Sequence, residues 1–522
     1  MNSFFQCDRY TALVQTDKGL VKGFRKGELL TFLGIPYARA RRFHAPVETE
    51  AWTGVLDACS YGFVCPLLAV SRPAGEIKVP HRYWATDEDC LNLNIWTPGT
   101  DEEKRPVLVW LHGGGYEAGS AIEQVAYDGA SLSRTGDVVV VTVNHRLNIL
   151  GYFDLSPYGE EYANSANAGG DDIIAALKWV QRNIAAFGGD PDNVTVFGQS
   201  GGGGKVTTLL QTPAADGLYA RGVVMSGVVG TLLREVEGDG RELAQALMRE
   251  IGISDVKGLE IVDYYLLARA YKKVKPALQR AGKYVGCCPH PNAFYAGDPM
   301  AAGFRQETKD IPLMVGSVYG EFASFAPSPF DRDRMTEQEQ MAVITDLVGK
   351  EKAGELVALF REAYPERHLI DLMRLDFIFR SPEIAYINQR SLLNDCTWSY
   401  LFNMDQPVEG GCTPWHCSDI PYFFRNIHLV DYPHGPQPEG LSARVQEQVS
   451  ASLLAFARTG NPQNDAIPEW APSKPGMEQI LIVDGETRVR TNYDHPLIAQ
   501  AEQTMGPAFR RMMQDPKNEI QH

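Results

Sequence analysis

The chain has 522 residues, of which 44% are hydrophobic and 22% are charged, as in an ordinary globular protein that is long enough for a large core. Its 49 basic and 65 acidic residues give a net charge of −16, which disfavours nucleic acid and anionic membrane surfaces as partners. The longest apolar runs are strand-length and fall well short of the roughly eighteen residues that a membrane helix needs. The first residues, MNSFFQCDRY, show neither the basic region nor the apolar stretch of a secretion signal, so we expect a cytoplasmic protein.

The N-terminal part of the chain has the pattern of antiparallel strands. Hydrophobic and polar residues alternate, and Asp17-Lys18-Gly19 marks a turn between two such runs. The predicted strands are residues 12–16, 20–24, 29–33 and 91–96.

Farther along the chain, continuous Val/Ile/Leu runs replace the alternation. Such runs are typical of parallel strands that are buried on both faces. Helical patterns separate them, and the clearest helix, residues 172–186, has apolar residues at three- and four-residue spacing before Gly188 ends it. This alternation predicts an α/β doubly wound sheet. The predicted strands are residues 107–111, 138–143, 194–197, 223–225, 311–315, 400–404 and 479–483, and a helix at 443–458 completes the core.

Two mostly helical segments interrupt the sheet pattern. Residues 230–283 and 328–394 are inserted between predicted strands, and we interpret them as a cap over the strand ends. The sequence shows no internal repeat, low-complexity tract or Gly/Ser linker. We therefore predict that residues 1–522 form a single domain.

The glycine-rich segment FGQSGGGGKVTT, residues 197–208, allows two interpretations. A phosphate-binding loop would need glycine at Gln199 and a hydroxyl residue at Val206, so two required residues are missing. The other interpretation is a G-x-S-x-G elbow, in which small neighbours let Ser200 occupy a strained strand-to-helix turn. The predicted strand before it and helix after it favour the elbow, with Ser200 as a nucleophile.

The loop after the predicted strand 107–111 reads HGGGY. Its glycines allow backbone N–H groups to converge on one point, which predicts an oxyanion hole. The alternative is a dinucleotide-binding fingerprint formed by Gly113, Gly115 and Ala118. That motif needs an acidic residue at the end of the next strand, where the sequence has Asn144.

A serine nucleophile needs a base and a carboxylate that orients the base. In an open α/β sheet, such residues lie in loops at the carboxyl ends of strands. His416 is the favoured histidine, because it lies in a polar loop after strand 400–404, and Glu321 follows strand 311–315. Asp419 is the competing carboxylate. From spacing alone, two ordinary alternatives stay open: Glu321 as a solvated carboxylate and His416 as a histidine that only packs in the core.

The nine cysteines are an odd number spread over a long chain, which is not the pattern of a disulfide scaffold. A zinc site is the alternative to ordinary buried thiols, but no C-x-x-C pair supports it. We expect neither a metal nor a cofactor. The residues from which a zinc site could be drawn are Cys287, Cys288, His290, Cys412, His416 and Cys417.

Several motifs occur in a characteristic order along nearly the whole chain: FLGIPYA (32–38), EDCLNLNIW (88–96), HGGGY (112–116), FGG followed by VTVFGQSGG (187–202), and FARTGNP (456–462). This order resembles type-B carboxylesterases of the bacterial type, which belong to the cholinesterase-like branch of the α/β-hydrolases. The second motif departs from the family pattern at Asn92, where an aromatic residue or threonine is usual. The resemblance implies an α/β-hydrolase fold with a mostly parallel central sheet and helical cap insertions.

The resemblance also implies roles for individual residues. Ser200 is similar to the family's nucleophile, Glu321 to its acid and His416 to its base. Ser226, in VVMSG, resembles a hydroxyl that supports the acid. The residues that match the oxyanion hole are Gly114, Gly115 and Gly201, and those that we assign to the substrate pocket are Tyr116, Gln199, Cys287 and Cys288.

Departures from the family pattern bear on the substrate and on the cysteines. Gln199 is neutral where the family often has glutamate, which argues against a cationic choline ester. Cys65 and Cys90 match cysteines that are bridged in secreted relatives, but here we expect free thiols. The small residues at 286–288 would leave room for a bulky acyl group.

We therefore predict a serine carboxylic-ester hydrolase that acts on a small-molecule ester through an acyl-enzyme. Cleavage of carbamates or amides, and acyl transfer to an alcohol, are alternatives that would use the same three residues. A non-catalytic interaction module of the same fold is the remaining alternative, and relatives of that kind lack a member of the triad. The sequence does not distinguish a monomer from a homodimer.

Overall fold

The computed structural model describes residues 4–8, 10–68, 80–228, 238–322, 331–406, 412–431 and 438–514. The chain divides into two compact units. The first unit comprises Met1–Val70, His81–Val224 and Thr231–Ile311, and the second comprises Ser71–Pro80, Met225–Gly230 and Pro312–His522. The single domain expected over residues 1–522 stays a prediction.

The first unit contains strands whose central members run parallel. Strand β10 pairs with β11 on one side and β12 on the other, so that Val107 lies opposite both Val139 and Val194. Antiparallel strands β9 and β5 continue the sheet beyond β11. The order is β1 (Phe5–Gln6), β4 (Phe24–Lys26), β5 (Leu29–Pro36), β9 (Asn92–Thr97), β11 (Val139–Val143), β10 (Arg105–Leu111), β12 (Gly189–Gln199) and β13 (Arg221–Met225). Two smaller sheets consist of β2 (Leu13–Gln15), β3 (Leu20–Lys22) and β8 (Val55–Asp57), and of β6 (Ala38–Arg39) and β7 (Val47–Glu48).

Helices cover the parallel strands, and strands that are covered in this way need apolar residues on both faces. Helix α1 (Ala130–Gly136) packs against β9 and β11, and α3 (Ala168–Asn183) and α4 (Gly201–Leu210) pack against β12. All five residues of β11 are buried. The expected pattern of parallel strands buried on both faces is therefore confirmed.

The predicted helix at 172–186 corresponds to α3, which begins and ends slightly earlier. Its last turn becomes a 3₁₀ segment at Ile184–Phe187. Gly188 then adopts a left-handed φ of 76°, and a Cβ atom there would lie 2.3 Å from the carbonyl oxygen of Gly99. Only glycine fits this helix end, which is the stop that the sequence predicted.

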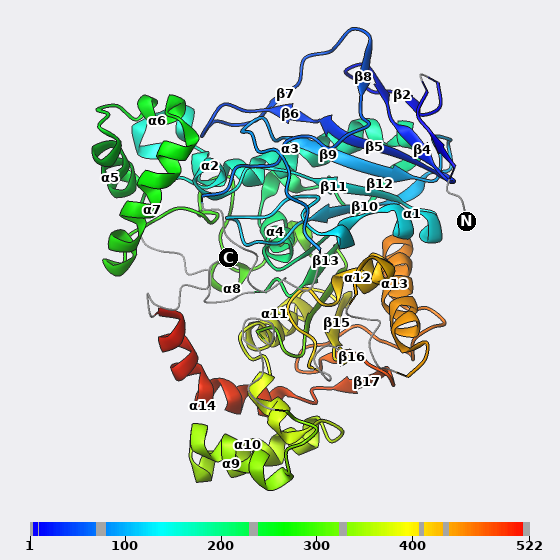
Figure 1. Cartoon of the computed structure of the whole chain (residues 1–522), viewed down its shortest axis with the longest axis vertical. Helices are drawn as coiled ribbons and strands as arrows, with labels where there is room; N and C mark the ends of the chain where they lie inside the picture. The colour runs from blue at the N-terminus through cyan, green and yellow to red at the C-terminus, as the bar shows by residue number, and fades with distance from the viewer. Residues whose placement is uncertain are drawn as a thin grey trace. The chain divides into compact units, whose positions relative to one another are not determined.

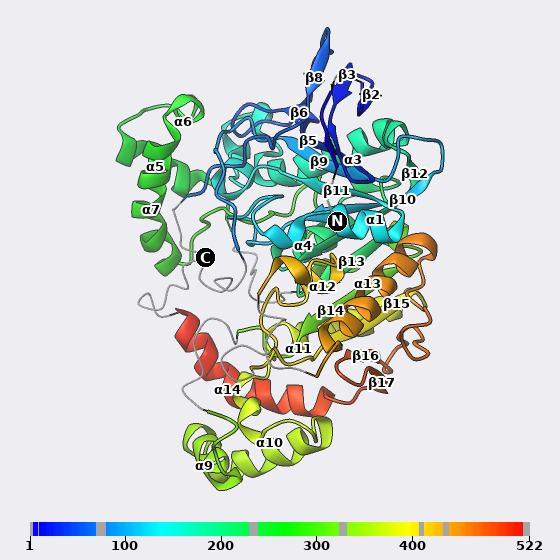
Figure 2. The same cartoon turned by 45° about the vertical axis from the view of Figure 1, so that its right-hand side comes forward.

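The insertion predicted at 230–283 contains three helices that lie together in both views of the chain (Figures 1 and 2). They are α5 (Arg241–Ile251), α6 (Lys257–Ile261) and α7 (Tyr264–Arg280). The carboxylate of Asp263 begins α7 by accepting the backbone N–H groups of Tyr265 and Leu266. Residues 230–237 of the predicted segment lie outside the described residues, and the role of these helices as a cap stays a prediction.

The second unit has three parallel strands and one antiparallel strand. Their order is β14 (Leu313–Val318), β15 (Thr397–Phe402), β16 (Gln479–Val483) and β17 (Arg488–Thr491). The insertion predicted at 328–394 contains α9 (Glu337–Val348), α10 (Lys350–Ala363) and α11 (Arg380–Ser391), and residues 328–330 lie outside the described residues. Further helices are α12 (Ile420–Phe423), α13 (Leu441–Thr459), which corresponds to the helix predicted at 443–458, and α14 (His495–Gln514).

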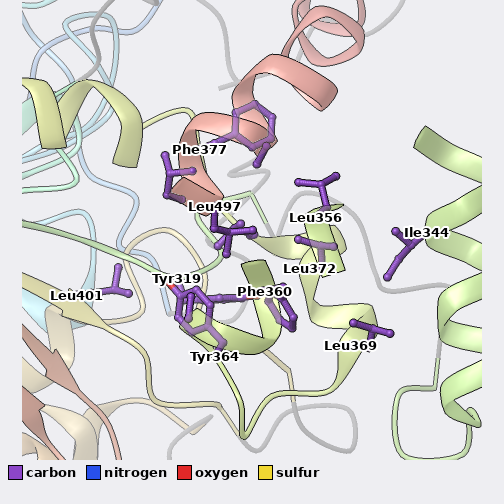
Figure 3. Packing of buried hydrophobic residues seen from close by; sticks show 14 of the residues in the cluster. Tyr319, Ile344, Leu356, Phe360, Tyr364, Leu369, Leu372, Phe377, Leu401 and Leu497 are labelled. Atoms are coloured by element: carbon purple, nitrogen blue, oxygen red, sulfur yellow. The ribbon is translucent and has the colours of Figure 1, made fainter. Parts of the chain in front are cut away.

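A buried apolar cluster joins the helices and strands of the second unit (Figure 3). It contains Tyr319, which lies in the turn after β14, together with Phe360 and Tyr364 at the end of α10. Leu401 on β15 and Leu497 on α14 also belong to it. The cluster anchors the turn in which Glu321 lies.

The structure corrects several predicted strand boundaries. Residues 20–24 do not form one strand, because the chain passes at Gly23 from β3 in one sheet to β4 in another. A Cβ atom at Gly23 would lie 2.2 Å from the carbonyl oxygen of Thr31, so the close approach of backbones requires glycine. The strand predicted at 311–315 runs instead from Leu313 to Val318, which places Glu321 three residues beyond its end. The sequence prediction missed β17 and α14.

The described part of the chain contains no helix that combines the length and the apolar composition of a membrane span. No disulfide joins any of the nine cysteines, all of which lie among the described residues, so Cys65 and Cys90 are not bridged.

Candidate active site

Ser200 occupies the turn between β12 and α4 in a strained backbone conformation. Its φ and ψ angles are 57° and −127°, outside the regions that an L-residue ordinarily populates. The neighbouring glycines permit the turn: a Cβ atom would lie 2.1 Å from the carbonyl oxygen of Gly115 if placed on Gly201, and 1.9 Å from that of Leu111 if placed on Gly202. This geometry is that of a nucleophile elbow.

The HGGGY loop follows β10 and lies beside this elbow. Gly114 and Gly115 have φ angles of 88° and 62°, and a Cβ atom on Gly113 would lie 3.4 Å from Cβ of Ser200. Among the described residues, no atom accepts a hydrogen bond from the N–H groups of Gly114, Gly115 or Gly201. An oxyanion hole needs such N–H groups, and the assignment of Gly114, Gly115 and Gly201 to one stays a prediction.

The residues assigned to the substrate pocket lie in the first unit. Gln199 is fully buried. The Tyr116 hydroxyl lies 3.0 Å from Oγ1 of Thr208, and its ring packs edge-on against Tyr152. The Cys287 N–H donates to the carbonyl oxygen of Tyr152, and Cys288 raises the pKa of Tyr116 after the larger effect of burial. Tyr152 therefore links the loop that carries Tyr116 to the loop that carries the two cysteines, while the pocket itself stays a prediction.

In the second unit, Glu321 and His416 form a close pair. Nδ1 of His416 is hydrogen-bonded to Oε2 of Glu321, and the backbone N–H of His416 donates to the Glu321 carbonyl oxygen at 3.0 Å. Oε1 of Glu321 accepts the N–H of Val318 at 2.9 Å. The carboxylate is fully buried and the imidazole is partly exposed. The bond at Nδ1 leaves Nε2 as the atom that can exchange a proton.

Phe379 supports the His416 imidazole. This contact was not predicted from the sequence. The two rings are 5.3 Å apart and inclined by 31°. The side-chain oxygens of Asp376 hold Phe379 at the start of α11 by accepting the N–H groups of Ile378, Phe379 and Arg380 at 3.0, 3.1 and 2.9 Å. A phenylalanine before a helix reads as an ordinary core residue in the sequence, so only the proximity of the rings identifies its place beside His416.

Ser226, which we predicted to support the acid, lies in the second unit near β14. Its backbone N–H donates to the carbonyl oxygen of Gly316 at 2.6 Å, and its φ is 45°. The hydroxyl is buried and has no hydrogen-bond partner among the described residues. Its support of Glu321 therefore stays a prediction.

Two further buried carboxyl groups lie near Glu321. Burial raises the pKa of Asp419 to about 7, and the charge of Glu321 adds to the shift. The same two causes raise the pKa of Asp376 to about 8. Asp419 accepts a hydrogen bond from the Tyr400 hydroxyl at 3.3 Å, whereas the Nδ1 atom of His416 bonds to Glu321. The geometry thus favours Glu321 over Asp419 as the partner of the imidazole.

The described residues contain one group of side chains spaced closely enough to hold a metal ion: Glu478, Asp494 and His495. The guanidinium of Arg380 lies between its carboxylates, 2.6 Å from Oε2 of Glu478 and 2.9 Å from Oδ2 of Asp494. This group is a buried ion-pair network and contains none of the six residues of the zinc hypothesis.

The chain matches known proteins over almost its full length. The model of the Carboxylesterase family matches residues 10–499. Para-nitrobenzyl esterase from Bacillus subtilis is 31% identical over 92% of this chain and 96% of its own length, and phenmedipham hydrolase from Pseudarthrobacter oxydans is 30% identical over 91% and 95%. A solved esterase from Clostridium hathewayi, described as able to hydrolyse aliphatic aromatic polyesters, has a TM-score of 0.93 and 48% identity over 96% of this chain and 100% of its own.

Proposed function

Because the chain belongs to the carboxylesterase family and is a carboxylic ester hydrolase with the α/β-hydrolase fold, we propose that it cleaves esters with the triad Ser200, His416 and Glu321. The observation that carries this proposal is the pairing of His416 with Glu321 through Nδ1. The strained backbone of Ser200 at the start of α4 supports the role of nucleophile.

In the first half-reaction, Nε2 of His416 takes the proton of the Ser200 hydroxyl while Oγ attacks the ester carbonyl carbon. Glu321 holds the imidazole and stabilises the cation that forms. The N–H groups of Gly114, Gly115 and Gly201 stabilise the oxyanion, and each donor typically contributes about 3 kcal/mol to the transition state. The ester C–O bond then breaks, and His416 gives its proton to the departing alcohol.

In the second half-reaction, water replaces the alcohol. His416 removes a proton from the water as its oxygen attacks the acyl-enzyme carbonyl, and the carboxylic acid leaves with regeneration of the Ser200 hydroxyl. An alcohol or another acceptor in place of water would give acyl transfer, and a carbamate or amide in place of the ester would give the corresponding hydrolysis. Turnover of an ester and of its matched carbamate, measured side by side, distinguishes these reactions.

An aliphatic aromatic polyester is a second candidate substrate. It is favoured by the 48% identity over 96% of the chain to the Clostridium hathewayi esterase. The small residues at 286–288, which include Cys287 and Cys288 of the predicted substrate pocket, are compatible with a bulky acyl group. Release of soluble aromatic acid from a polyester film, compared with release by the Ser200→Ala variant, tests this substrate directly.

The primary test uses p-nitrophenyl esters of increasing acyl length. Wild-type turnover that falls by several orders of magnitude in folded Ser200→Ala supports the proposal. A reactive organophosphate should label wild-type protein with one equivalent on Ser200, as mass spectrometry of peptides can show. Undiminished turnover in the alanine variant would refute the triad.

A further inference from the structure

Lys205 is a buried lysine that the proposed mechanism does not use. It lies on α4, five residues after Ser200, and only 1% of its surface is exposed. Its Nζ atom donates a hydrogen bond of 2.8 Å to the carbonyl oxygen of His112, the first residue of the HGGGY loop. The lysine that ends the GGGGK run therefore faces the HGGGY loop.

Helix α4 lies against this loop from its first turn. A Cβ atom on Gly202 would lie 2.9 Å from the same His112 carbonyl oxygen. One turn farther along the helix, Thr208 reaches the other end of the loop, where its Oγ1 is 3.0 Å from the Tyr116 hydroxyl. Because Thr208 also donates to the carbonyl oxygen of Gly204, it accepts the bond from Tyr116. Two contacts from one helix thus bracket the three glycines of the loop.

The charge of Lys205 has no carboxylate partner at ion-pair distance in the described part of the chain. Glu123 opposes the fall in its pKa from a distance, and burial lowers that pKa to about 7. The Tyr116 ring lies 5.7 Å from Nζ, within cation–π range. The ammonium is therefore held mainly by the loop that it contacts.

Two neutral histidines complete the surroundings of Lys205. The rings of His112 and His145 are stacked 4.9 Å apart with an angle of 13°. Their Nδ1 atoms lie 2.9 and 3.0 Å from the carbonyl oxygens of Gly113 and Arg146, so each Nδ1 carries the hydrogen. Burial lowers the pKa of both histidines, and the charge of Lys205 lowers it further. Protonated Lys205 thus faces uncharged imidazoles.

We propose that Lys205 is a positioning residue of the oxyanion hole: its hydrogen bond to the His112 carbonyl oxygen fixes the loop that presents the N–H groups of Gly114 and Gly115. This inference rests on the proposed function. A charged donor makes a stronger hydrogen bond than a neutral one, and a loop of three glycines has much conformational freedom to lose. Displacement of the two N–H groups would weaken stabilisation of the transition state more than binding of the ground state.

The test compares Lys205→Met, which keeps the length of the side chain, with wild type and with Lys178→Met, an exposed lysine on α3 that serves as the control. Initial rates on a p-nitrophenyl ester give kcat and KM from pH 5 to pH 10. We expect kcat of Lys205→Met to fall by about 10- to 100-fold, somewhat less than the loss of a whole oxyanion donor, with KM within about threefold of wild type. Lys178→Met should match wild type.

The pH profile separates positioning by a charged group from simple packing. The groups that face Lys205 are His112, His145, Tyr116 and Glu123, and burial lowers the pKa of both histidines. Wild type should lose kcat on the alkaline side as Lys205 loses its proton, and Lys205→Met should lack this limb. Lys205→Gln, which keeps an N–H donor without the charge, provides a second variant if the methionine variant does not fold.

The outcomes of the test are distinct. A reduced kcat together with loss of the alkaline limb supports the proposal, whereas wild-type kcat or a persistent alkaline limb in a folded variant overturns it. Ser200→Ala is measured in parallel: if it is inactive, failure at Lys205 refutes only the positioning role. If Ser200→Ala hydrolyses the ester as fast as wild type does, both the triad and the positioning role of Lys205 are refuted.

Discussion

His416 and Glu321 are joined twice across 95 residues of sequence, once through the imidazole Nδ1 and a carboxylate oxygen and once through the backbone N–H and carbonyl groups. The backbone bond fixes the loop of His416 against the turn after β14, and the side-chain bond fixes the ring within that loop. A base held in this way can exchange protons only through Nε2.

Replacement of Glu321 by Gln should therefore show how much of the activity depends on the charge of this side chain and how much on its size. The amide keeps the size of the carboxylate but cannot stabilise an imidazolium, so we expect kcat on a p-nitrophenyl ester to fall by about 10³- to 10⁴-fold. Asp419→Asn should lower kcat by less than about tenfold, because Asp419 bonds to Tyr400. A larger loss in Asp419→Asn than in Glu321→Gln, with both variants folded by circular dichroism, would identify Asp419 as the acid.

Asp419 should also affect stability in a pH-dependent way. Its pKa is near 3.8 in the unfolded chain and about 7 in the folded protein, because burial and the charge of Glu321 disfavour the anion. Between these values the folded state holds a proton that the unfolded state has lost, so stability contributed at this site falls as the pH rises from about 4 to 7.

The variant Asp419→Asn removes this titration. Its Tm relative to wild type should therefore increase by a few degrees between pH 5 and pH 8. The measurement is differential scanning calorimetry of both proteins at the two pH values. A Tm difference that does not change with pH would show that Asp419 is already ionised in the folded protein at pH 5.

The elbow should tolerate no side chain at Gly202. A Cβ atom there would lie 1.9 Å from the Leu111 carbonyl oxygen, so Gly202→Ala must displace α4 or the end of β10. We expect the free energy of unfolding to fall by about 3 kcal/mol or more and ester turnover to be lost. The control is Gly354→Ala on α10, where no atom lies within 4 Å of the added Cβ and alanine should stabilise the helix by about 0.5 to 1 kcal/mol. Equal urea midpoints for the two variants would contradict this account.

Much of the fold could be predicted from the sequence because parallel strands and helix stops depend on local patterns. Glu321 and His416 could be placed as candidates because each follows a predicted strand, and the carboxyl ends of parallel strands meet at one edge. Phe379 could not, since its approach to His416 depends on how the start of α11 packs and on the bonds that Asp376 accepts there. The direction of Lys205 was likewise hidden, because the GGGGK run has the composition of a phosphate loop while its lysine faces a backbone carbonyl group.

Lys205 should reduce stability at low pH while supporting catalysis. Its pKa is lowered from 10.5 to about 7 by burial. Below pH 7 the folded protein therefore bears the full cost of a buried charge. From pH 7 to about 10.5 the unfolded state holds a proton that the folded state has lost, so the stability of wild type at this site rises with pH. Lys205→Met should have a Tm a few degrees above wild type at pH 6, and this advantage should shrink by pH 9.

A variant that is more stable at pH 6 and yet slower in ester turnover would distinguish a positioning charge from a packing residue, because loss of a packing residue lowers both quantities together. Thermal unfolding of wild type, Lys205→Met and the control Lys178→Met at pH 6 and pH 9 measures the effect. A Tm of Lys205→Met that lies below that of wild type by the same amount at both pH values would contradict this prediction. The ammonium would then not destabilise the folded protein, because groups other than the His112 carbonyl would compensate its charge.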